Sequence, residues 1–502
     1  MLQALSKAHG WLFSRRHKPE SESEMVARRL AEAHDQADPI LEQVAPTHVL
    51  ITHEGGILCV DPLTGELTQR SFEDANYEPA CCSIADGAVT LRASPTQAPA
   101  LRGRAIADRD GVIGLCLEGG YYLCASPHLG PVSTASVALD AWERLMPLSL
   151  ADVGLLRAFA ARRWLIDEDA RPTARHSLAL SPGFRALIGG RSCLLTELLA
   201  LLRSPPGALH PSGLPMSFVF FHETCTPARA LLFEPLIYST ISGSDYFFDQ
   251  YELSVRSIER FGQYDGSYLL VSDRDDEDVI VGFSGVAVSR RACLKQDFPT
   301  LDRLMGARRE ALRHPAFAGF QPVLYVDSDV ICDAPIEGLL VAAVRCERVV
   351  ISAEHDGQAL SALPPEDRNW FGGFLYAPND PALLAHRCVN SGLFGGRNRE
   401  TLDTSLTLVE RAWALYKAAH GDLHQAAFDQ PFFSFVLQTL ELAEIEPTRS
   451  RVRILNDSEP GPDSAPVGLA HFNIGVGRDK IDAMRRYFGL LDIRAFEMVS
   501  ET

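Results

Sequence analysis

The sequence lacks several features that would place it in a common class of protein. No apolar run reaches the roughly 18 residues that a membrane-spanning helix needs. The 11 cysteines are scattered and include no CxxC pair, which excludes a disulfide framework or a cysteine zinc site and indicates reduced thiols in a cytoplasmic protein. The chain is also short of positive charge, and its net charge of −18 argues against binding to bulk nucleic acid or anionic membranes.

The first 18 residues lack the long apolar core of a secretory signal. They are basic and weakly amphipathic, which allows two interpretations: a segment that touches a membrane surface, or a frayed terminal helix. Residues 19–44 are acidic and helix-prone, so we expect residues 1–44 to form a helical or flexible segment. The length of 502 residues predicts two or three domains in all.

Three segments between residues 45 and 148 resemble one another. Glu54-Gly55-Gly56 and Glu118-Gly119-Gly120 each lead through a Leu-Cys pair to a proline and a glycine, and a degenerate copy begins at Asp86-Gly87. Threefold repetition of a short β unit predicts a closed, pseudo-symmetric barrel. This pattern resembles a β-trefoil of the fascin-like kind, for which sugar binding and a structural or docking role are both open.

The segment between residues 149 and 214 reads as a helical connector. Ser149 and Asp152 have the spacing of a capping box and predict a helix that starts there, and a second helix is expected over residues 194–202. Residues 203–215 are rich in proline and glycine and predict a domain boundary. We therefore expect a separate β-rich module over 45–148, a connector with a linker over 149–214, and a catalytic domain over 215–502.

Strands and helices alternate beyond residue 215. Apolar runs predict strands at 236–241, 268–271, 279–283 and 323–326, and helical periodicity marks the segments 248–258, 301–312 and 402–416. Such alternation predicts a mostly parallel α/β sheet covered by helices.

The strand at 323–326 ends in Asp327-Ser328-Asp329. Open α/β sheets bind ligands at the carboxyl ends of their strands. Residues i and i+2 of an extended segment point the same way, so both carboxylates can bind one hard cation. An acidic turn without a ligand is the alternative.

Six segments in order resemble the nucleotide-sugar glycosyltransferases of the GT-A fold, of the family 8 type that includes glycogenin and bacterial lipopolysaccharide glycosyltransferases. They are EPLIYSTISG, SIERFG, LYVDSDV, VNSGLFGG, FDQP and AHFNIGVG, spread over roughly residues 230–490. The resemblance implies a Rossmann-like GT-A domain. It also implies transfer of a hexose from a nucleotide-diphosphate sugar, expected to be a UDP-hexose, to a glycan, lipid-glycan or protein acceptor.

The resemblance also assigns site residues. It implies that Asp327, Asp329 and His471 bind Mn²⁺ or Mg²⁺, although His471 alone would read as an ordinary buried histidine. It implies donor contacts from Tyr238, Ser239, Thr240, Ser328, Asn390, Ser391, Gly392, Asn473, Gly475, Gly477 and Lys480. For some of these a structural role is the alternative: core packing for Tyr238 and a polar turn for residues 390–392.

Asp429 and Gln430 match the family's Asp-Gln pair near the anomeric carbon, which makes them the expected catalytic residues. The alternative is a helix N-terminus with Asp429 as its cap and Pro431 in its first turn. No QxxRW follows Asp329, the pattern of many inverting enzymes of this fold, so retention of configuration is favoured. Front-face displacement and double displacement both remain open.

Two other functions fit parts of the sequence. A glycoside hydrolase also uses paired carboxylates, but it needs no nucleotide-binding segment. A non-catalytic carbohydrate-binding protein would use the trefoil-like and transferase-like parts as docking surfaces, and the intact Asp327, Asp329 and His471 argue against it.

Overall fold

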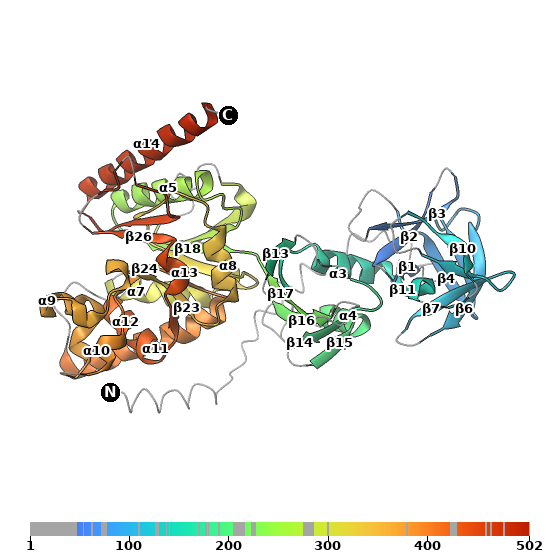
Figure 1. The fold of residues 1–502 in the computed structure, drawn as a ribbon, viewed down its shortest axis with the longest axis horizontal. Helices are drawn as coiled ribbons and strands as arrows, with labels where there is room; N and C mark the ends of the chain where they lie inside the picture. The colour runs from blue at the N-terminus through green and yellow to red at the C-terminus, as the bar shows by residue number, and fades with distance from the viewer. Residues whose placement is uncertain are drawn as a thin grey trace. The chain divides into compact units, whose positions relative to one another are not determined.

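The chain divides into two compact units. The computed structural model describes residues 48–500 apart from 54, 62–63, 72–77, 109–110, 126–129, 137, 140, 169–170, 176–177, 179, 189–190, 204–215, 222–226, 275–285, 299–300, 378–379, 422–428, 457–458, 462–463 and 475–476. The first unit comprises the described residues up to Leu232, and the second unit begins at Phe233. Figure 1 draws the helices and strands of both.

Six strands of the first unit pair in a closed ring. They are β1 (His48–Thr52), β4 (Cys81–Ala85), β5 (Ala88–Arg92), β6 (Leu101–Ala107), β7 (Ile113–Leu117) and β11 (Arg144–Ser149). Each pairs antiparallel with the next in that order, and β11 returns to β1. The closed barrel that the repeats predict is therefore present, and the ring has no free edge. The trefoil assignment stays a prediction.

Five further strands pair outside the ring, and the rest of the first unit is a mixed α/β layer. The outer strands are β2 (Gly56–Val60), β3 (Leu67–Ser71), β8 (Tyr122–Cys124), β9 (Gly130–Pro131) and β10 (Ser133–Ser136). Helices α3 (Leu150–Ala160) and α4 (Leu195–Arg203) accompany an antiparallel sheet of β12 (Trp164–Glu168), β13 (Arg171–Arg175), β14 (Arg185–Ile188), β15 (Arg191–Leu194), β16 (Ser217–Phe221) and β17 (Pro227–Leu232).

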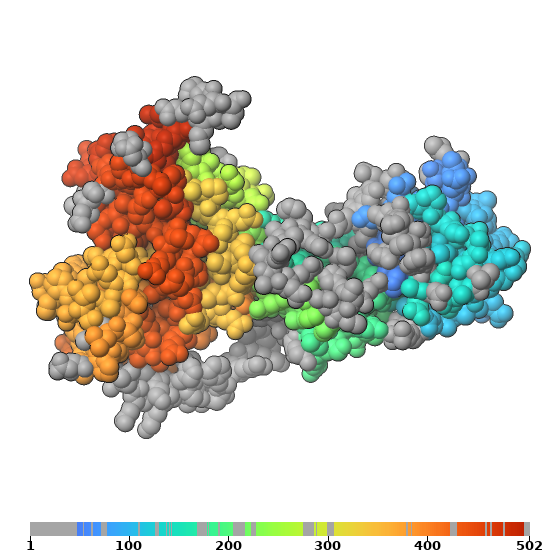
Figure 2. Space-filling model, in the orientation of Figure 1, coloured from blue at the N-terminus to red at the C-terminus, as the bar shows by residue number. Residues whose placement is uncertain are grey.

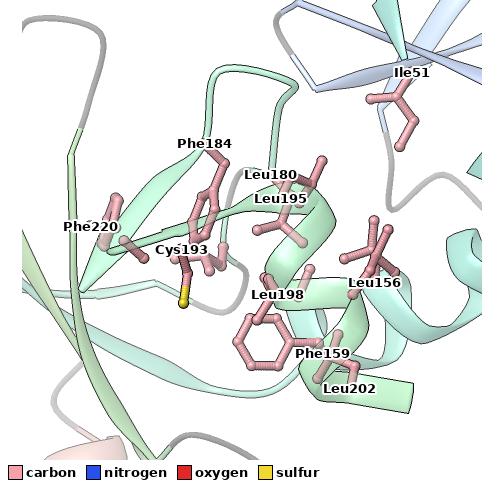
Figure 3. Packing of buried hydrophobic residues seen from close by; sticks show 14 of the residues in the cluster. Ile51, Leu156, Phe159, Leu180, Phe184, Cys193, Leu195, Leu198, Leu202 and Phe220 are labelled. Carbon is pink, nitrogen blue, oxygen red and sulfur yellow. The ribbon is translucent and has the colours of Figure 1, made fainter. Parts of the chain in front are cut away.

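The barrel is not a separate module, because its core continues into this layer. Side chains alternate along β1: Leu50 packs inside the barrel, whereas Val49 and Ile51 pack against α3, α4 and the second sheet. Figure 3 labels members of this shared cluster, among them Ile51 of β1, Leu156 of α3 and Leu198 of α4.

The expected boundaries at 148/149 and 214/215 therefore need correction. The expected connector contains strands as well as the two predicted helices. Strands β16 and β17 lie beyond the proline-rich stretch but pair with β14 and β12 of the first unit. The units divide after Leu232, because these pairings tie the chain on both sides of the stretch into one sheet.

The second unit is built on a seven-stranded mixed sheet. Its order is β20 (Arg291–Lys295), β19 (Ser267–Ser272), β18 (Leu236–Ile241), β21 (Val323–Val326), β24 (Val389–Gly396), β23 (Val349–Ala353) and β25 (Ala443–Glu444). Strand β24 runs antiparallel to β21 and β23, and the other neighbours are parallel. The mostly parallel sheet is confirmed, while the strand expected at 279–283 lies outside the described residues.

Helices cover both faces of this sheet (Figure 1). The α-helices that the structure describes in this unit are α5 (Asp245–Arg260), α7 (Leu301–Glu310), α8 (Glu337–Arg345), α9 (Pro365–Arg368), α10 (Ala382–Ala385), α11 (Arg399–His420), α12 (Gln430–Thr439), α13 (Glu446–Arg449) and α14 (Arg478–Ser500). A small sheet of β22 (Val330–Cys332), β27 (Leu469–Phe472) and β26 (Val452–Leu455) packs with α5 and α14. Within the described part of the chain, no helix has both the length and the apolar character to cross a membrane.

Candidate active site

Asp327 and Asp329 lie at the carboxyl end of the central strand of the second unit. All four residues of β21 are buried, as expected for an apolar strand between β18 and β24. The backbone N–H of Asp327 donates to the carbonyl of Gly392 at 2.8 Å. The sheet therefore presents the two carboxylates at the edge where α/β proteins bind ligands.

The pairing of β22 with β27 brings His471 to these carboxylates. Val330 lies opposite His471 in this antiparallel ladder, and Nε2 of His471 lies 3.0 Å from Oδ1 of Asp329. Potential ligand atoms of Asp327, Asp329 and His471 all lie within 4.8 Å of one another.

These residues fit a divalent cation. Carboxylate oxygens with one imidazole nitrogen are a donor set for Mn²⁺, and Mg²⁺ suits the oxygens. Gly392 leaves space beside them: a Cβ atom there would overlap the His471 ring and lie 2.5 Å from Oδ2 of Asp327. A larger residue at position 392 would therefore fill the space between two of the three ligands.

The two aspartates differ in their electrostatic surroundings. Burial raises the pKa of Asp327, more than Arg308 lowers it. Burial also acts on Asp329, but His471 and Lys480 together hold the pKa of this carboxyl below its ordinary value. Nζ of Lys480 lies 2.7 Å from Oδ2 of Asp329, so a positive charge from α14 lies beside this carboxylate, while the donor contact expected of Lys480 stays a prediction.

Arg308 of α7 links the aspartates to the predicted catalytic segment. Its Nη2 lies 3.1 Å from Oδ1 of Asp327, and its Nη1 lies 2.8 Å from Oδ2 of Asp429. Nη1 also donates to the carbonyl of Ser391 at 3.2 Å, and the guanidinium lies 4.6 Å from the centre of the Tyr325 ring. Carboxylates on two sides compensate the cost of burying this charge and raise the pKa of Arg308.

Asn390, Ser391 and Gly392 lie inside strand β24, so the alternative of a turn between strands is wrong. The amide of Asn390 donates to Oε2 of Glu354 at 2.9 Å, and its Oδ1 accepts from the N–H of Gly392 at 2.7 Å. The hydroxyl of Ser391 lies 3.2 Å from Oδ1 of Asp429. The segment thus connects the metal candidates to the start of α12.

Asp429 and Gln430 begin α12, but the carboxylate of Asp429 makes no capping hydrogen bond. It contacts Arg308 and Ser391 instead, so the interpretation of this side chain as a helix cap is wrong. The expected proline in the first turn is present. Among the described residues, the amide of Gln430 makes two long contacts, 3.5 Å to the N–H of Ser391 and 3.4 Å to Glu354. Such lengths exceed the usual range, so Gln430 is weakly engaged by the protein.

The three candidates on β18 take structural positions. Tyr238 is completely buried, its ring packs edge-on against Phe317 and Tyr325, and its hydroxyl donates to the carbonyl of Arg308. A nucleotide base cannot stack on it, so the expected donor contact gives way to the packing alternative. Ser239 donates to the carbonyl of Val326.

Thr240 is the third candidate on β18, Ser328 and Asn473 follow the ends of β21 and β27, and Gly477 precedes α14. Thr240 contacts the Tyr325 hydroxyl at 3.2 Å. Ser328 donates to Gln250 at 3.2 Å, and Asn473 donates to Asn456 at 3.1 Å. Gly477 has a left-handed backbone with φ of 59° at the residue before α14, a conformation that favours glycine. Gly475 lies outside the described residues.

A cavity of about 530 Å³ is lined by half of the predicted site residues. Eight predicted residues line it: Asp327, Asp329, Asn390, Ser391, Gly392, Gln430, His471 and Asn473. Its other lining residues were not predicted: Glu354, His355, Asp367, Trp370, Phe371 and Asn456. Figure 2 shows how segments far apart in sequence, drawn in orange and red, share one surface of this unit.

Arg308 and Glu354 were not predicted as site residues, but the sequence around each contains a pattern that indicates a functional position. Arg308 lies four residues after Leu304 and four before Leu312, which puts a charge on the apolar face of the predicted helix. Glu354 directly follows an apolar strand, as Asp327 does. Strands β21 and β23 both run antiparallel to β24, so their carboxyl ends meet at one edge.

No family model matches the sequence, and no curated protein matches it. Among solved structures, similar chains include a galactosyltransferase, LgtC, in complex with donor and acceptor sugar analogues (14% identity, 51% of this chain and 95% of that one, TM-score 0.36). Mouse xyloside xylosyltransferase 1 in its apo form is another (13%, 47% and 97%, TM-score 0.33). An active-site mutant of LgtC has a TM-score of 0.35. Scores this low carry no argument about function, which has to rest on the side chains of the site.

Proposed function

We propose that the chain is a metal-dependent glycosyltransferase that moves a hexose from a UDP-sugar to a glycan, lipid-glycan or protein acceptor with retention of configuration. One observation carries the proposal: Asp327, Asp329 and His471 meet within 4.8 Å on the wall of a cavity that Gln430 also lines. The candidate cation site and the amide of Gln430 thus line one cavity, and the hydrogen bonds of this amide to the described residues are long.

Asp327, Asp329 and His471 would hold the cation, which when bound would stabilise the charge that develops on a diphosphate leaving group. Lys480 contributes a second positive charge beside Asp329. In the reaction, the bond between the anomeric carbon and the diphosphate oxygen breaks. The acceptor hydroxyl oxygen forms the new bond, and its proton passes to the diphosphate.

Gln430 and Asp429 take different roles in this proposal. Asp429 is paired with Arg308 at 2.8 Å, so we assign it to holding the site. Gln430 lines the cavity and can offer its amide to the reacting sugar. Trp370 also lines the cavity and is 47% exposed, which gives the acceptor sugar an aromatic face to pack against.

The geometry disfavours the hydrolase alternative. The two carboxyl groups of a glycoside hydrolase stand on either side of the scissile bond, whereas the carboxylate of Asp329 is already paired with Nε2 of His471 at 3.0 Å and with Nζ of Lys480 at 2.7 Å. Oxygens gathered this closely around an imidazole suit one cation better than a sugar ring between them.

The test is a panel of UDP-, GDP- and ADP-sugars, assayed for hydrolysis and transfer with Mn²⁺ and with excess chelator. Metal-dependent use of one nucleotide class is the expected result. Metal-dependent nucleotide binding without turnover on any donor would instead support a carbohydrate-binding protein. Metal-independent cleavage of a simple glycoside would support a hydrolase.

A further inference from the structure

A second cavity, of about 500 Å³, adjoins the first in the same unit. His355 and Asn456 line both cavities. The second cavity continues from these residues along β26 and past the end of α13, where Arg453 and Arg449 line it. The two cavities therefore lie next to each other, with His355 and Asn456 in the lining of both.

The two cavities differ in charge. Four carboxylates line the first: Asp327, Asp329, Glu354 and Asp367. Among the described residues that line the second cavity, Asp356 is the one carboxylate, against the guanidinium groups of Arg449 and Arg453. The chain as a whole has a net charge of −18, whereas the described lining of this cavity has two arginines and one acidic residue. A concave surface with such a local excess of positive charge suits an anion.

Within the part of the chain that the structure describes, neither arginine forms a buried ion pair with a carboxylate. Arg449 lies 3.4 Å from Glu446 in a pair whose side chains are both well exposed, and such pairs contribute little. Arg453 donates to the carbonyl of Ala465, and no carboxylate pairs with it among the residues that the structure describes. Both guanidinium groups keep donors for a ligand, and Arg can bind a carboxylate or a phosphate through two parallel hydrogen bonds.

The backbone between the cavities is strained. His355 and Asp356 have φ values of 47° and 54°, in the left-handed region that few non-glycine residues adopt. The N–H of Gly357 donates to the carbonyl of Glu354 at 2.9 Å, and the His355 ring packs edge-on against Phe371. The surrounding structure thus holds His355 where the cavities meet.

We propose that the second cavity is an acceptor subsite that binds a negatively charged group, a carboxylate or a phosphate, on the sugar acceptor. The acceptor hydroxyl lies in the first cavity, and Arg449 and Arg453 hold the anionic group. This inference rests on the proposed glycosyltransferase function and adds the chemical class of the acceptor. Binding energy from a remote anionic group would orient the hydroxyl for transfer.

The test uses matched saccharides: a disaccharide ending in glucuronic acid, the same disaccharide ending in glucose, and the glucose form carrying a terminal 6-phosphate. Binding to the full chain is measured by calorimetry with UDP and Mn²⁺ present. We expect one anionic probe to bind at least about tenfold more tightly than the neutral one, the effect of hydrogen bonds to a charged group. The arm that gains affinity distinguishes carboxylate from phosphate.

Arg453→Gln and Arg449→Gln should each reduce the preference for the anionic probe. Arg256→Gln is the matched control, because it removes one positive charge from an exposed pair with Glu252 on α5. Thermal unfolding checks that each variant is folded. A preference that survives in the Arg453→Gln, Arg449→Gln double variant, or that Arg256→Gln removes equally, would overturn the subsite.

Transfer assays on the same wild-type preparation separate the two proposals. If the protein uses a nucleotide sugar but binds neutral and anionic probes equally, or binds none, the subsite is wrong and the proposed function stands. If no nucleotide sugar is used under any condition, the proposed function fails, whatever the probes bind.

Discussion

The guanidinium of Arg308 and the carboxylate of Asp429 form a buried ion pair across 121 residues of sequence, with Nη1 2.8 Å from Oδ2 and both side chains 9% exposed. The other terminal nitrogen of Arg308 lies 3.1 Å from Asp327. One arginine therefore positions a metal candidate and the segment that starts α12.

Arg308→Met should lower the free energy of unfolding of the second unit by about 3 kcal/mol, because Asp429 stays buried without its counter-charge. The midpoint of urea unfolding measures the loss. Arg313→Met is the control: its pair with Asp403 is long and exposed, and should contribute about 0.5 kcal/mol. Equal losses in the two variants would remove the positioning role of Arg308.

Asp327→Asn and Asp329→Asn should each abolish Mn²⁺ binding and reduce turnover about a thousandfold, because each removes a charged oxygen ligand at a strand end. Electron paramagnetic resonance of added Mn²⁺ follows binding without relying on activity. Asp249→Asn, at an exposed position on α5, should leave it unchanged. Full turnover in excess chelator would contradict the metal assignment outright.

Gln430→Ala should slow single-turnover sugar transfer much more than it weakens UDP binding. An interaction made mainly in the transition state lowers turnover and leaves ground-state affinity largely unchanged. Gln438→Ala serves as control, since this amide of the same helix bonds to Arg387 and Ser434 and does not line the cavity. An equal fall in UDP affinity and turnover would count against a role for Gln430 in the chemistry.

Gly392→Ala should weaken Mn²⁺ binding about tenfold or more, the usual effect of disturbing the support of metal ligands. The added Cβ would overlap His471 and crowd Asp327. Gly489→Ala adds the same atom to α14 where no heavy atom lies within 4 Å, so it should leave binding intact. Wild-type affinity in Gly392→Ala would show that the ligands gather elsewhere.

Acid should destabilise the first unit through Asp152. Burial raises the pKa of this carboxyl, but Arg203 and Ser149 lower it more, so it lies below the ordinary 3.8. A carboxyl whose pKa is lower in the folded than in the unfolded chain stabilises the fold at pH values above its unfolded-state pKa. That contribution is lost as the pH falls below about 4. As the pH is lowered from 7 to 3, the melting temperature should therefore fall less steeply in Asp152→Asn than in wild type. The exposed Asp86→Asn variant should match wild type.

Local pattern was sufficient for much of the second unit. The apolar run at β21 and the acids that end it were readable from the sequence, because a buried strand needs continuous apolar residues and its end is where polarity returns. The Ser149 capping box was also correct, since the hydroxyl of Ser149 accepts from the N–H of Asp152 at 3.1 Å. Both signals depend on residues only a few positions apart.

Tertiary structure decided what depends on distant pairings. His471 lies beside Asp329 because β27 pairs with β22. Arg308 contacts both Asp327 and Asp429 because the fold brings α7 to the end of β21 and to the start of α12. The aromatic at Tyr238 lies in the core because Phe317 and Tyr325 close around it. The unit boundary lies after Leu232 and not at the proline-rich stretch, because β16 and β17 pair with β14 and β12, which precede that stretch. Periodicity in a sequence reports which face of an element is buried, whereas strand register and buried ion pairs depend on segments that meet only in the folded chain.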